Sequence, residues 1–218
     1  MIEVITTCVN YGDYFNVTLP LNYPLFDKMY VVTSSSDIVT QTVCAEYSDK
    51  VECIVSDIFF ENGAIFNKGK GINLALKRAA KRDWMLITDA DIILPSNLRD
   101  CVAHAKDKKA IYAAKRVICP RREDLNRINS REAKNTKIGH PLMGRFQYPV
   151  VGYFQLFHSS SCHFTKNPKY REDSPTAAVC DLSFAQQWPE EDTLGIKSHC
   201  IHLGMNSRNW NGRVTGSF

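Results

Sequence analysis

The sequence predicts an α/β fold whose central sheet is Rossmann-like, mostly parallel and flanked by helices. Runs rich in β-branched residues alternate with helix-like segments through the first half of the chain. Polar residues follow directly where several of these runs end. In sheets of this kind, ligands bind at the carboxyl ends of the parallel strands.

Each element of the first half follows from a local pattern. Strands are expected at 2–8, 29–33, 51–55 and 83–88. Helices are expected at 13–22, at 38–47 after the capping residues SSSD, and at 67–82. Pro20 should limit or kink the first of these helices. In the third, Ile72, Ala75, Leu76, Ala79 and Ala80 recur at helical spacing and should form its buried face.

The second half is less regular. Strands are expected at 108–118, 148–160 and 196–204, and a short helix at 179–188. The sequence shows no internal repeat and no clear linker, so one compact unit is the expected organisation.

Composition narrows the class of protein. With 218 residues, 44% of them hydrophobic and 23% charged, the chain resembles an ordinary globular domain. It contains no apolar run long enough to span a membrane and no signal-like amino terminus, so we expect a cytoplasmic protein. The eight cysteines are scattered without a Cys-x-x-Cys pair, which favours free thiols in a reducing compartment over a structural zinc site.

Positive charge is concentrated in the segment 104–145. It holds twelve Lys and Arg against four acids, a net charge of about +8, whereas the whole chain carries +4. A solvated surface and a site for an anionic substrate are both open interpretations.

Two carboxylates interrupt the apolar run LITDADIILP. Asp89 and Asp91 have the i, i+2 spacing that points both side chains to one side of an extended chain. Mg²⁺ and Mn²⁺ commonly bind one or two carboxylates together with substrate phosphates. A strand end with turn-forming acids is the simpler alternative.

Two further segments could belong to the same site. In NKGKGIN a glycine-rich turn leads into a helix, where free backbone N–H groups and Lys68 and Lys70 suit a phosphate or a base edge. An exposed basic helix start would look the same. His202 ends the last expected strand and could reach the same cation, although a single His beside apolar residues is more often structural.

Taken in order, these motifs resemble the GT-A fold nucleotide-sugar glycosyltransferases, especially the large family-two group. The resemblance includes a first strand ending in ITT, VVT followed by Asp, N-K-G-K-G-x-N-x-A, the D-x-D, an acid about ninety residues later and a terminal H-L-G. It implies one GT-A-like domain over 1–218, with a nucleotide-binding half at 1–95 and an acceptor and catalytic half at 96–218. It also implies a metal-dependent transfer of sugar from a nucleoside diphosphate sugar, UDP by default, to an acceptor hydroxyl with inversion.

The resemblance assigns roles to individual residues. Thr6, Thr7 and Asp37 would line the nucleoside pocket, and the lysines Lys68 and Lys70 would lie near the base or phosphates. Asp89 would face the ribose and the metal, while Asp91 and His202 would hold Mn²⁺ or Mg²⁺. Gly152 and Gln155 would contact the sugar or the acceptor.

The resemblance also implies a catalytic base. Asp181 is the best positional match for the second acid of the family's Glu-Asp pair, but Cys180 stands where that pair has Glu. Glu190, Glu191 and Asp192 are competing candidates. Asp181 could equally be a helix cap.

Other functions stay open at this stage. A sugar-1-phosphate nucleotidyltransferase has a related fold, but its G-G-x-G-T-R signature is missing. A non-catalytic nucleotide- or carbohydrate-binding module and a metal-dependent hydrolase are further alternatives. The acceptor could be a glycan, a protein or a nucleic acid, and the basic segment could close over the diphosphate or hold a polyanionic acceptor. Trp210 could stack on a sugar and Arg208 or Arg213 could bind phosphate, or the tail could simply pack over the cleft.

Overall fold

The first half of the sheet is a parallel unit of four strands, and the three inner ones are buried on both faces. The four strands are β1 (Ile2–Thr7), β2 (Lys28–Thr33), β3 (Val51–Val55) and β4 (Trp84–Ile87). They lie in the order β3-β2-β1-β4, and each neighbouring pair is parallel. Strands buried on both faces are typical of such sheets. The first-half strands predicted from the sequence are therefore present, within one or two residues at their ends.

The computed structural model describes residues 1–125, 152–204 and 209–213. Predictions that fall on 126–151 and 205–208, including those for Arg208 and for the part of the basic segment from 126 to 145, lie outside the described residues. Within the described ranges, no helix is both long enough and apolar enough to cross a membrane.

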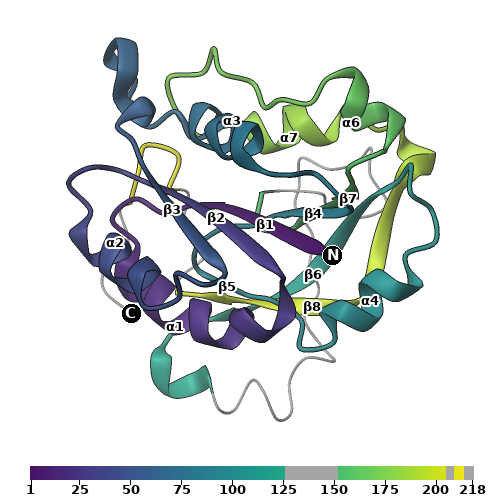
Figure 1. Ribbon diagram of the computed structural model, residues 1–218, viewed down its shortest axis with the longest axis horizontal. Helices are drawn as coiled ribbons and strands as arrows, with labels where there is room; N and C mark the ends of the chain where they lie inside the picture. Colours follow the sequence, from purple (N-terminus) through teal and green to yellow (C-terminus); the bar gives the residue numbers. More distant parts are fainter. Residues whose placement is uncertain (126–151, 205–208, 214–218) are drawn as a thin grey trace.

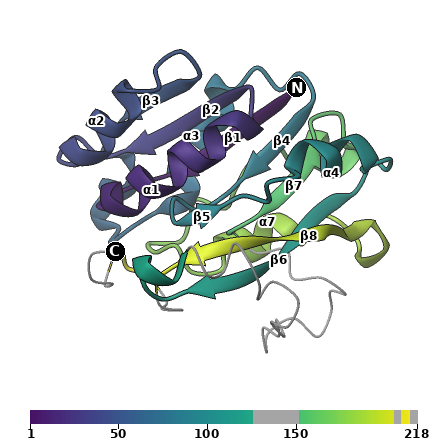
Figure 2. The same cartoon turned by 90° about the horizontal axis from the view of Figure 1, so that it is seen from below.

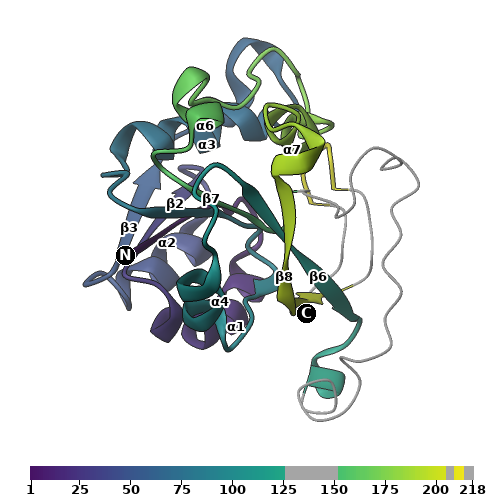
Figure 3. The same ribbon diagram turned by 90° about the vertical axis from the view of Figure 1, so that its right-hand side faces the viewer.

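The second half of the sheet mixes strand directions. It contains β5 (Ile92–Ile93), β6 (Ile111–Cys119), β7 (Gln155–His158) and β8 (Thr193–Leu203), in the order β7-β6-β8-β5 after β4. β7 is antiparallel to both β4 and β6, and β5 is antiparallel to β8. The long strands β6 and β8 run parallel and side by side (Figures 2 and 3). The single mixed sheet of eight strands has more parallel than antiparallel pairs, as predicted.

Helices cover both faces of this sheet (Figure 1). One layer consists of α1 (Gly12–Asn22), α2 (Ile38–Ala45) and α4 (Leu98–His104). The other consists of α3 (Lys68–Arg78), α6 (Cys162–Lys166) and α7 (Cys180–Ala185). Short 3-10 segments lie at η1 (Tyr23–Leu25), η2 (Ile58–Gly63), η3 (Arg122–Asp124) and η4 (Glu190–Asp192), and η2 is interrupted by a kink at Glu61 and Asn62.

Alternation along the strands divides the core between the two layers. In β1, Val4 packs with the α1 side of the sheet and Ile5 with the α3 side. Phe15 of α1 belongs to the first cluster, and Phe184 of α7 belongs to the second. The two helix layers are thereby fixed on the sheet that carries the polar strand ends.

Two elements differ from their predicted bounds by four residues or more. Helix α3 ends at Arg78, and Ala80 is exposed instead of lying on the buried helix face. The reason is a long-range contact, because the carboxylate of buried Glu3 accepts hydrogen bonds from the backbone N–H groups of Ala80 and Arg82 and draws the chain out of the helix. The strand predicted at 148–160 is limited, among described residues, to Gln155–His158, since 152–153 form a turn.

Helix α1 continues through Pro20 and ends two residues later. Its buried polar residues then hold the loop after β4. Asn22 donates to the backbone carbonyl of Ile92 and accepts from the N–H of Leu94, both at 2.8 Å. Thr18 donates to the carbonyl of Ala90 at 2.7 Å. The segment that carries Asp89 and Asp91 is therefore anchored to α1.

Candidate active site

A cavity of about 270 Å³ lies at the carboxyl ends of β1 and β4. Its walls come from parts of the chain that are distant in sequence: the strand ends, the start of α3, the middle of β6, the turn before β7, the start of α7 and the tail after β8. The charged and imidazole side chains in its lining are Lys68, Asp89, Asp91, Arg116, Asp181, His202 and Arg213. The polar ends of β1 and β4 therefore face one crevice, as expected for an α/β sheet, whereas the end of β2 does not contribute to its lining.

Asp91 and His202 meet because β5 pairs with β8. Ile92 lies opposite His202 in this antiparallel pair, and the N–H of Leu203 donates to the carbonyl of Asp91 at 2.9 Å. The Nε2 atom of His202 then lies 3.2 Å from Oδ2 of Asp91. Arg116 of β6 donates from its guanidinium to Nδ1 of the same ring at 3.3 Å.

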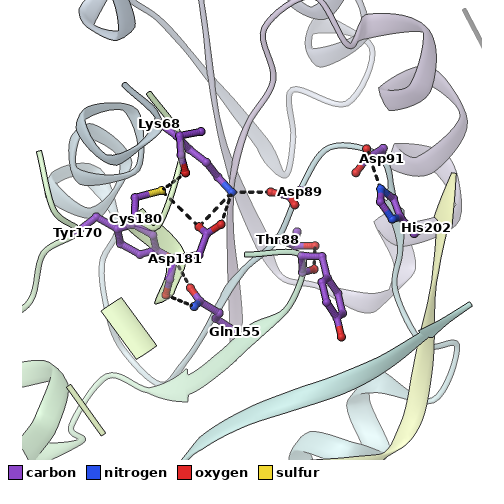
Figure 4. A network of polar contacts seen from close by, with 11 residues as sticks. Lys68, Thr88, Asp89, Asp91, Gln155, Tyr170, Cys180, Asp181 and His202 are labelled. Atoms are coloured by element: carbon purple, nitrogen blue, oxygen red, sulfur yellow. Dashed lines mark hydrogen bonds and ion pairs between the residues drawn. The ribbon is translucent and has the colours of Figure 1, made fainter. Parts of the chain in front are cut away.

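The other carboxylate oxygen of Asp91 is suited to a ligand that the chain itself does not supply. Oδ1 of Asp91 is buried and accepts no hydrogen bond from the described residues. Buried polar atoms are nearly always paired, so an orphan acceptor beside an imidazole fits a cation site. In the described part of the chain, however, no three His, Cys, Asp or Glu side chains form a ready metal cluster. Asp89 points towards Lys68 instead of joining Asp91 and His202 (Figure 4).

Lys68 lies between two carboxylates from opposite walls of the cavity (Figure 4). Its Nζ atom is 2.7 Å from Oδ1 of Asp89 and 3.1 Å from Oδ1 of Asp181. The Lys68 side chain is only 9% exposed. Burial by itself would lower the pKa of this ammonium, but Asp181 and Asp89 outweigh burial and raise the pKa well above its usual value. Lys68 therefore stays charged.

The two carboxylates respond differently to the same ammonium. Burial opposes ionisation of Asp89, but Lys68 outweighs burial, and the pKa of Asp89 is lowered. For Asp181, burial is the largest influence and is only partly offset by Lys68; the charge of Asp89 adds to it, and the pKa of Asp181 is raised. A carboxylate with a raised pKa is the better proton acceptor of the pair.

Asp181 is held in place by residues far from it in sequence. Gln155 of β7 donates to the backbone carbonyl of Asp181 at 2.9 Å and also accepts a hydrogen bond from Tyr170. The carboxylate packs directly on the backbone of Gly152, where any Cβ would overlap it. Glycine at position 152 thus allows the carboxylate to lie this close to the backbone. Cys180, in place of the family's Glu, is buried, and its thiol donates to Oδ1 of Asp181 at 3.6 Å.

Several residues predicted for the site do not line the cavity. Asp37 is the N-cap of α2, and its carboxylate accepts from the backbone N–H groups of Asn10 and Thr40. Lys70 forms an ion pair with Glu61 at 2.9 Å. Gln155 supports Asp181 from behind. Thr7 lines the cavity, whereas Thr6 is fully buried beneath it, with a hydroxyl that has no hydrogen-bond partner among the described residues.

The competing bases also lie elsewhere. Glu190, Glu191 and Asp192 form the η4 turn, which does not contribute to the cavity, and Asp192 pairs with His163 at 2.7 Å. Asp181 does line the cavity.

Arg116 was noted in the sequence only as part of the basic segment. The structure places it in the cavity wall, over the ring of Tyr153 at 4.8 Å and beside His202. Alternation along β6 was the signal that could have found it, because a cation in a buried strand must face a polar space. Arg121, in contrast, forms ion pairs with Glu123 and Asp124.

The described part of the tail covers one side of the cavity. The N–H of Ala177 donates to the carbonyl of Trp210 at 2.9 Å. Arg213 forms a two-pronged ion pair with Asp13 and lies over the rings of Tyr11 and Tyr14. Trp210 and Arg213 both line the cavity, so the tail packs over the cleft and also presents these side chains to it.

Val179 is strained at the edge of the cavity. It precedes α7 with φ 58° and ψ −5°, a left-handed conformation that is rare for a β-branched residue. Val179→Gly should raise the free energy of unfolding by about 0.5–1 kcal/mol, because relief of strain exceeds the extra entropy of glycine. The midpoint of thermal unfolding should rise by about 1–4 °C. Val179→Ala retains the Cβ and should give no comparable gain. A lower midpoint for the glycine variant would contradict the strained conformation.

Comparison with known proteins places these features in context. The sequence model of glycosyl transferase family 2 matches residues 3–165. A search of curated proteins finds no significant match. Among solved structures, the chain is similar to glucosyl-3-phosphoglycerate synthase from Mycobacterium tuberculosis in complex with Mn²⁺, UDP-glucose and glycerol 3-phosphate. The TM-score is 0.60 at 13% identity, covering 95% of this chain and 73% of that one.

A second kind of neighbour shares the fold. The 4-diphosphocytidyl-2C-methyl-D-erythritol synthase from Anaerococcus prevotii gives a TM-score of 0.54 at 12% identity, covering 96% of this chain and 92% of that one. At these identities the structural likeness establishes the fold alone.

Proposed function

Because the chain belongs to glycosyl transferase family 2, we propose that it is a nucleotide-sugar glycosyltransferase that uses a divalent cation, takes a UDP-sugar and transfers the sugar to an acceptor hydroxyl with inversion. One observation carries the proposal. A single cavity holds Asp91 and His202 on one side and Asp181 on the other, with the Lys68–Asp89 ion pair between them.

The balance of charge in the cavity supports a diphosphate with a cation. The described lining contains three carboxylates, Asp89, Asp91 and Asp181, and three cationic side chains, Lys68, Arg116 and Arg213. With His202 neutral these charges cancel. The diphosphate of a nucleotide sugar brings about two negative charges into this neutral site, and a divalent cation would compensate them.

Asp91 and His202 would hold Mn²⁺ or Mg²⁺ on the diphosphate. The orphan Oδ1 of Asp91 and the adjacent imidazole fit such an ion, and phosphate oxygens would complete its coordination. Asp89 would have to turn away from Lys68 to coordinate the cation directly. Its carboxylate would therefore lie near the ribose or at the edge of the cation's coordination shell. When bound, the cation stabilises the negative charge that develops on the departing diphosphate.

Asp181 would act as the base. The acceptor oxygen forms a bond to the anomeric carbon while the bond from that carbon to the diphosphate breaks, and the hydroxyl proton passes to the Asp181 carboxylate. Attack from the side opposite the leaving group inverts the anomeric configuration. The raised pKa of Asp181 suits proton acceptance, and Gly152 provides space for its carboxylate at the cavity wall.

A panel of nucleotide sugars tests this function. Incubation with Mn²⁺ should release a nucleoside diphosphate from one donor and raise the melting temperature with that donor, since a ligand that binds only the folded state stabilises it. At a ligand concentration of about 100 Kd the stabilisation should be about 2.7 kcal/mol. The UDP-sugars are expected to respond most strongly. If no nucleotide sugar shifts the melting temperature or is turned over, the proposed function is wrong.

A parallel assay with nucleoside triphosphates and phosphorylated sugars tests for a nucleotidyltransferase, which the second structural neighbour keeps as an alternative. Such an enzyme would join a nucleoside triphosphate to a phosphorylated substrate and release pyrophosphate. A glycosyltransferase releases a nucleoside diphosphate from a nucleotide sugar. Detection of pyrophosphate from CTP or UTP would favour the alternative.

A further inference from the structure

One ammonium group connects the two chemical halves of the cavity. Lys68 is the first residue of α3 and is positioned by the N-cap Asn67, whose side chain accepts from the N–H of Lys70. From there its Nζ atom contacts Asp89, which follows β4, and Asp181, which lies in α7. Asp89 lies on the side of the cavity proposed for the donor, and Asp181 is the proposed base.

This ammonium has few N–H donors to share. Nζ carries three, and its contacts at 2.7 Å to Asp89 and at 3.1 and 3.3 Å to the two oxygens of Asp181 engage them. The side chain is almost completely buried, so solvent offers little replacement. A diphosphate that enters the cavity would therefore reach Lys68 only by taking a donor from one of these carboxylates.

Of the two carboxylates, Asp181 is the easier one to displace. Its contacts with Nζ, at 3.1 and 3.3 Å, are longer than the 2.7 Å contact of Asp89. On the opposite side it packs against the backbone of Gly152, which offers it no cation. Loss of the ammonium would leave the Asp181 carboxylate facing the cavity without this ion pair.

We propose that Lys68 is a positioning residue through which the Asp181 carboxylate and the donor diphosphate compete for one ammonium group. The proposal rests on the proposed function. Donor binding draws Lys68 towards the phosphates and releases Asp181 to accept the acceptor's proton. When no donor is bound, the Asp181 carboxylate stays paired with Lys68. Since coupling between two sites is reciprocal, removing the Asp181 charge should strengthen diphosphate binding.

Two simpler explanations make different predictions. Asp181 could repel a diphosphate through space without any part for Lys68. Lys68 could also be purely structural, tying α3 to the loop after β4 and to α7. Only competition for a shared ammonium makes the effect of Asp181 on diphosphate affinity depend on Lys68.

A double-mutant cycle separates these explanations. The Kd of a nucleoside diphosphate is measured by calorimetry with Mg²⁺ for the wild type, Asp181→Asn, Lys68→Gln and the double variant. UDP is the first probe, followed by GDP, CDP, dTDP and ADP. Where Lys68 is present, Asp181→Asn should lower the Kd of the nucleoside diphosphate by about fivefold or more, which lies within the usual range of coupling between two sites. In the Lys68→Gln background the same change should alter the Kd less than about twofold.

Controls keep the result interpretable. Lys77→Gln removes the same charge from an exposed position of the same helix and should leave the coupling intact. Melting curves check that each variant is folded. If Lys68→Gln does not fold, Lys68→Arg replaces it. A forked guanidinium can bind a carboxylate and a phosphate at the same time. In the Lys68→Arg background, Asp181→Asn should therefore tighten diphosphate binding less than it does in the wild type.

Each outcome decides the matter. Equal tightening in both backgrounds would show through-space repulsion, and no tightening in either would show that the ammonium is not shared. Both results overturn the inference while the proposed function stands. If the wild type binds none of the nucleoside diphosphates, the proposed function fails and the inference fails with it.

Discussion

Asp181→Asn should lower kcat by about 10²- to 10⁴-fold, the usual contribution of a general base. The amide has the shape of the carboxylate and can still accept from Lys68, but it cannot take a proton. Since Asp181 must be ionised to act, the wild-type rate should fall at low pH. Its raised pKa places that fall above the range of an ordinary aspartate. Steady-state kinetics across pH with the donor found in the panel measure both effects.

The matched control is Glu191→Gln, a substitution of an exposed acid in η4, outside the cavity. Its kcat should stay close to the wild-type value. An active Asp181→Asn variant together with an inactive Glu191→Gln variant would move the base to the η4 turn. An acceptor product that retains the anomeric configuration, read by NMR, would refute direct displacement by the Asp181 route.

Asp91→Asn should abolish the part of activity and of thermal stabilisation that depends on the metal. The buried Oδ1 of Asp91 accepts no hydrogen bond from the described residues, and a neutral amide is a poor ligand for a hard cation. In the wild type, Mn²⁺ with the nucleoside diphosphate at about 100 Kd should stabilise the fold by about 2.7 kcal/mol. For a chain of this size, that corresponds to about 5–10 °C in melting temperature. The variant should lose most of this shift.

The melting temperature of the ligand-free variant should change little, because the amide can still bond to His202. Asp100→Asn changes an exposed acid in the first turn of α4 and should behave like the wild type. If Asp91→Asn keeps the full metal-dependent shift, the cation is held elsewhere in the cavity.

The parallel half of the sheet could be predicted because its signals are local. Runs such as IEVITT and MYVVT favour strands wherever they occur, and their two-sided apolar character indicates burial in a parallel sheet. The ordered motifs predicted the family, which the match over residues 3–165 confirms.

Predictions failed where a distant residue changed a local preference. The apolar spacing that included Ala80 was sound for an isolated helix, but Glu3 from β1 captures the N–H of Ala80 and ends α3 earlier. The two-residue strand β5 could not be found from its own sequence, because only its pairing with β8 defines it.

Local sequence alone therefore determined the family, most of the sheet and several of the charged residues near its ligand-binding edge, including Lys68, Asp89 and Asp91. Tertiary structure decided which of these groups touch. Asp91 meets His202, 111 residues away, only through the register of β5 against β8. Lys68 meets Asp181, 113 residues away, only because α3 and α7 pack on the same face of the sheet. Hydrophobic periodicity reports which face of an element is buried, but the pairing of charges across a cavity depends on strand register and helix packing, which no local pattern contains.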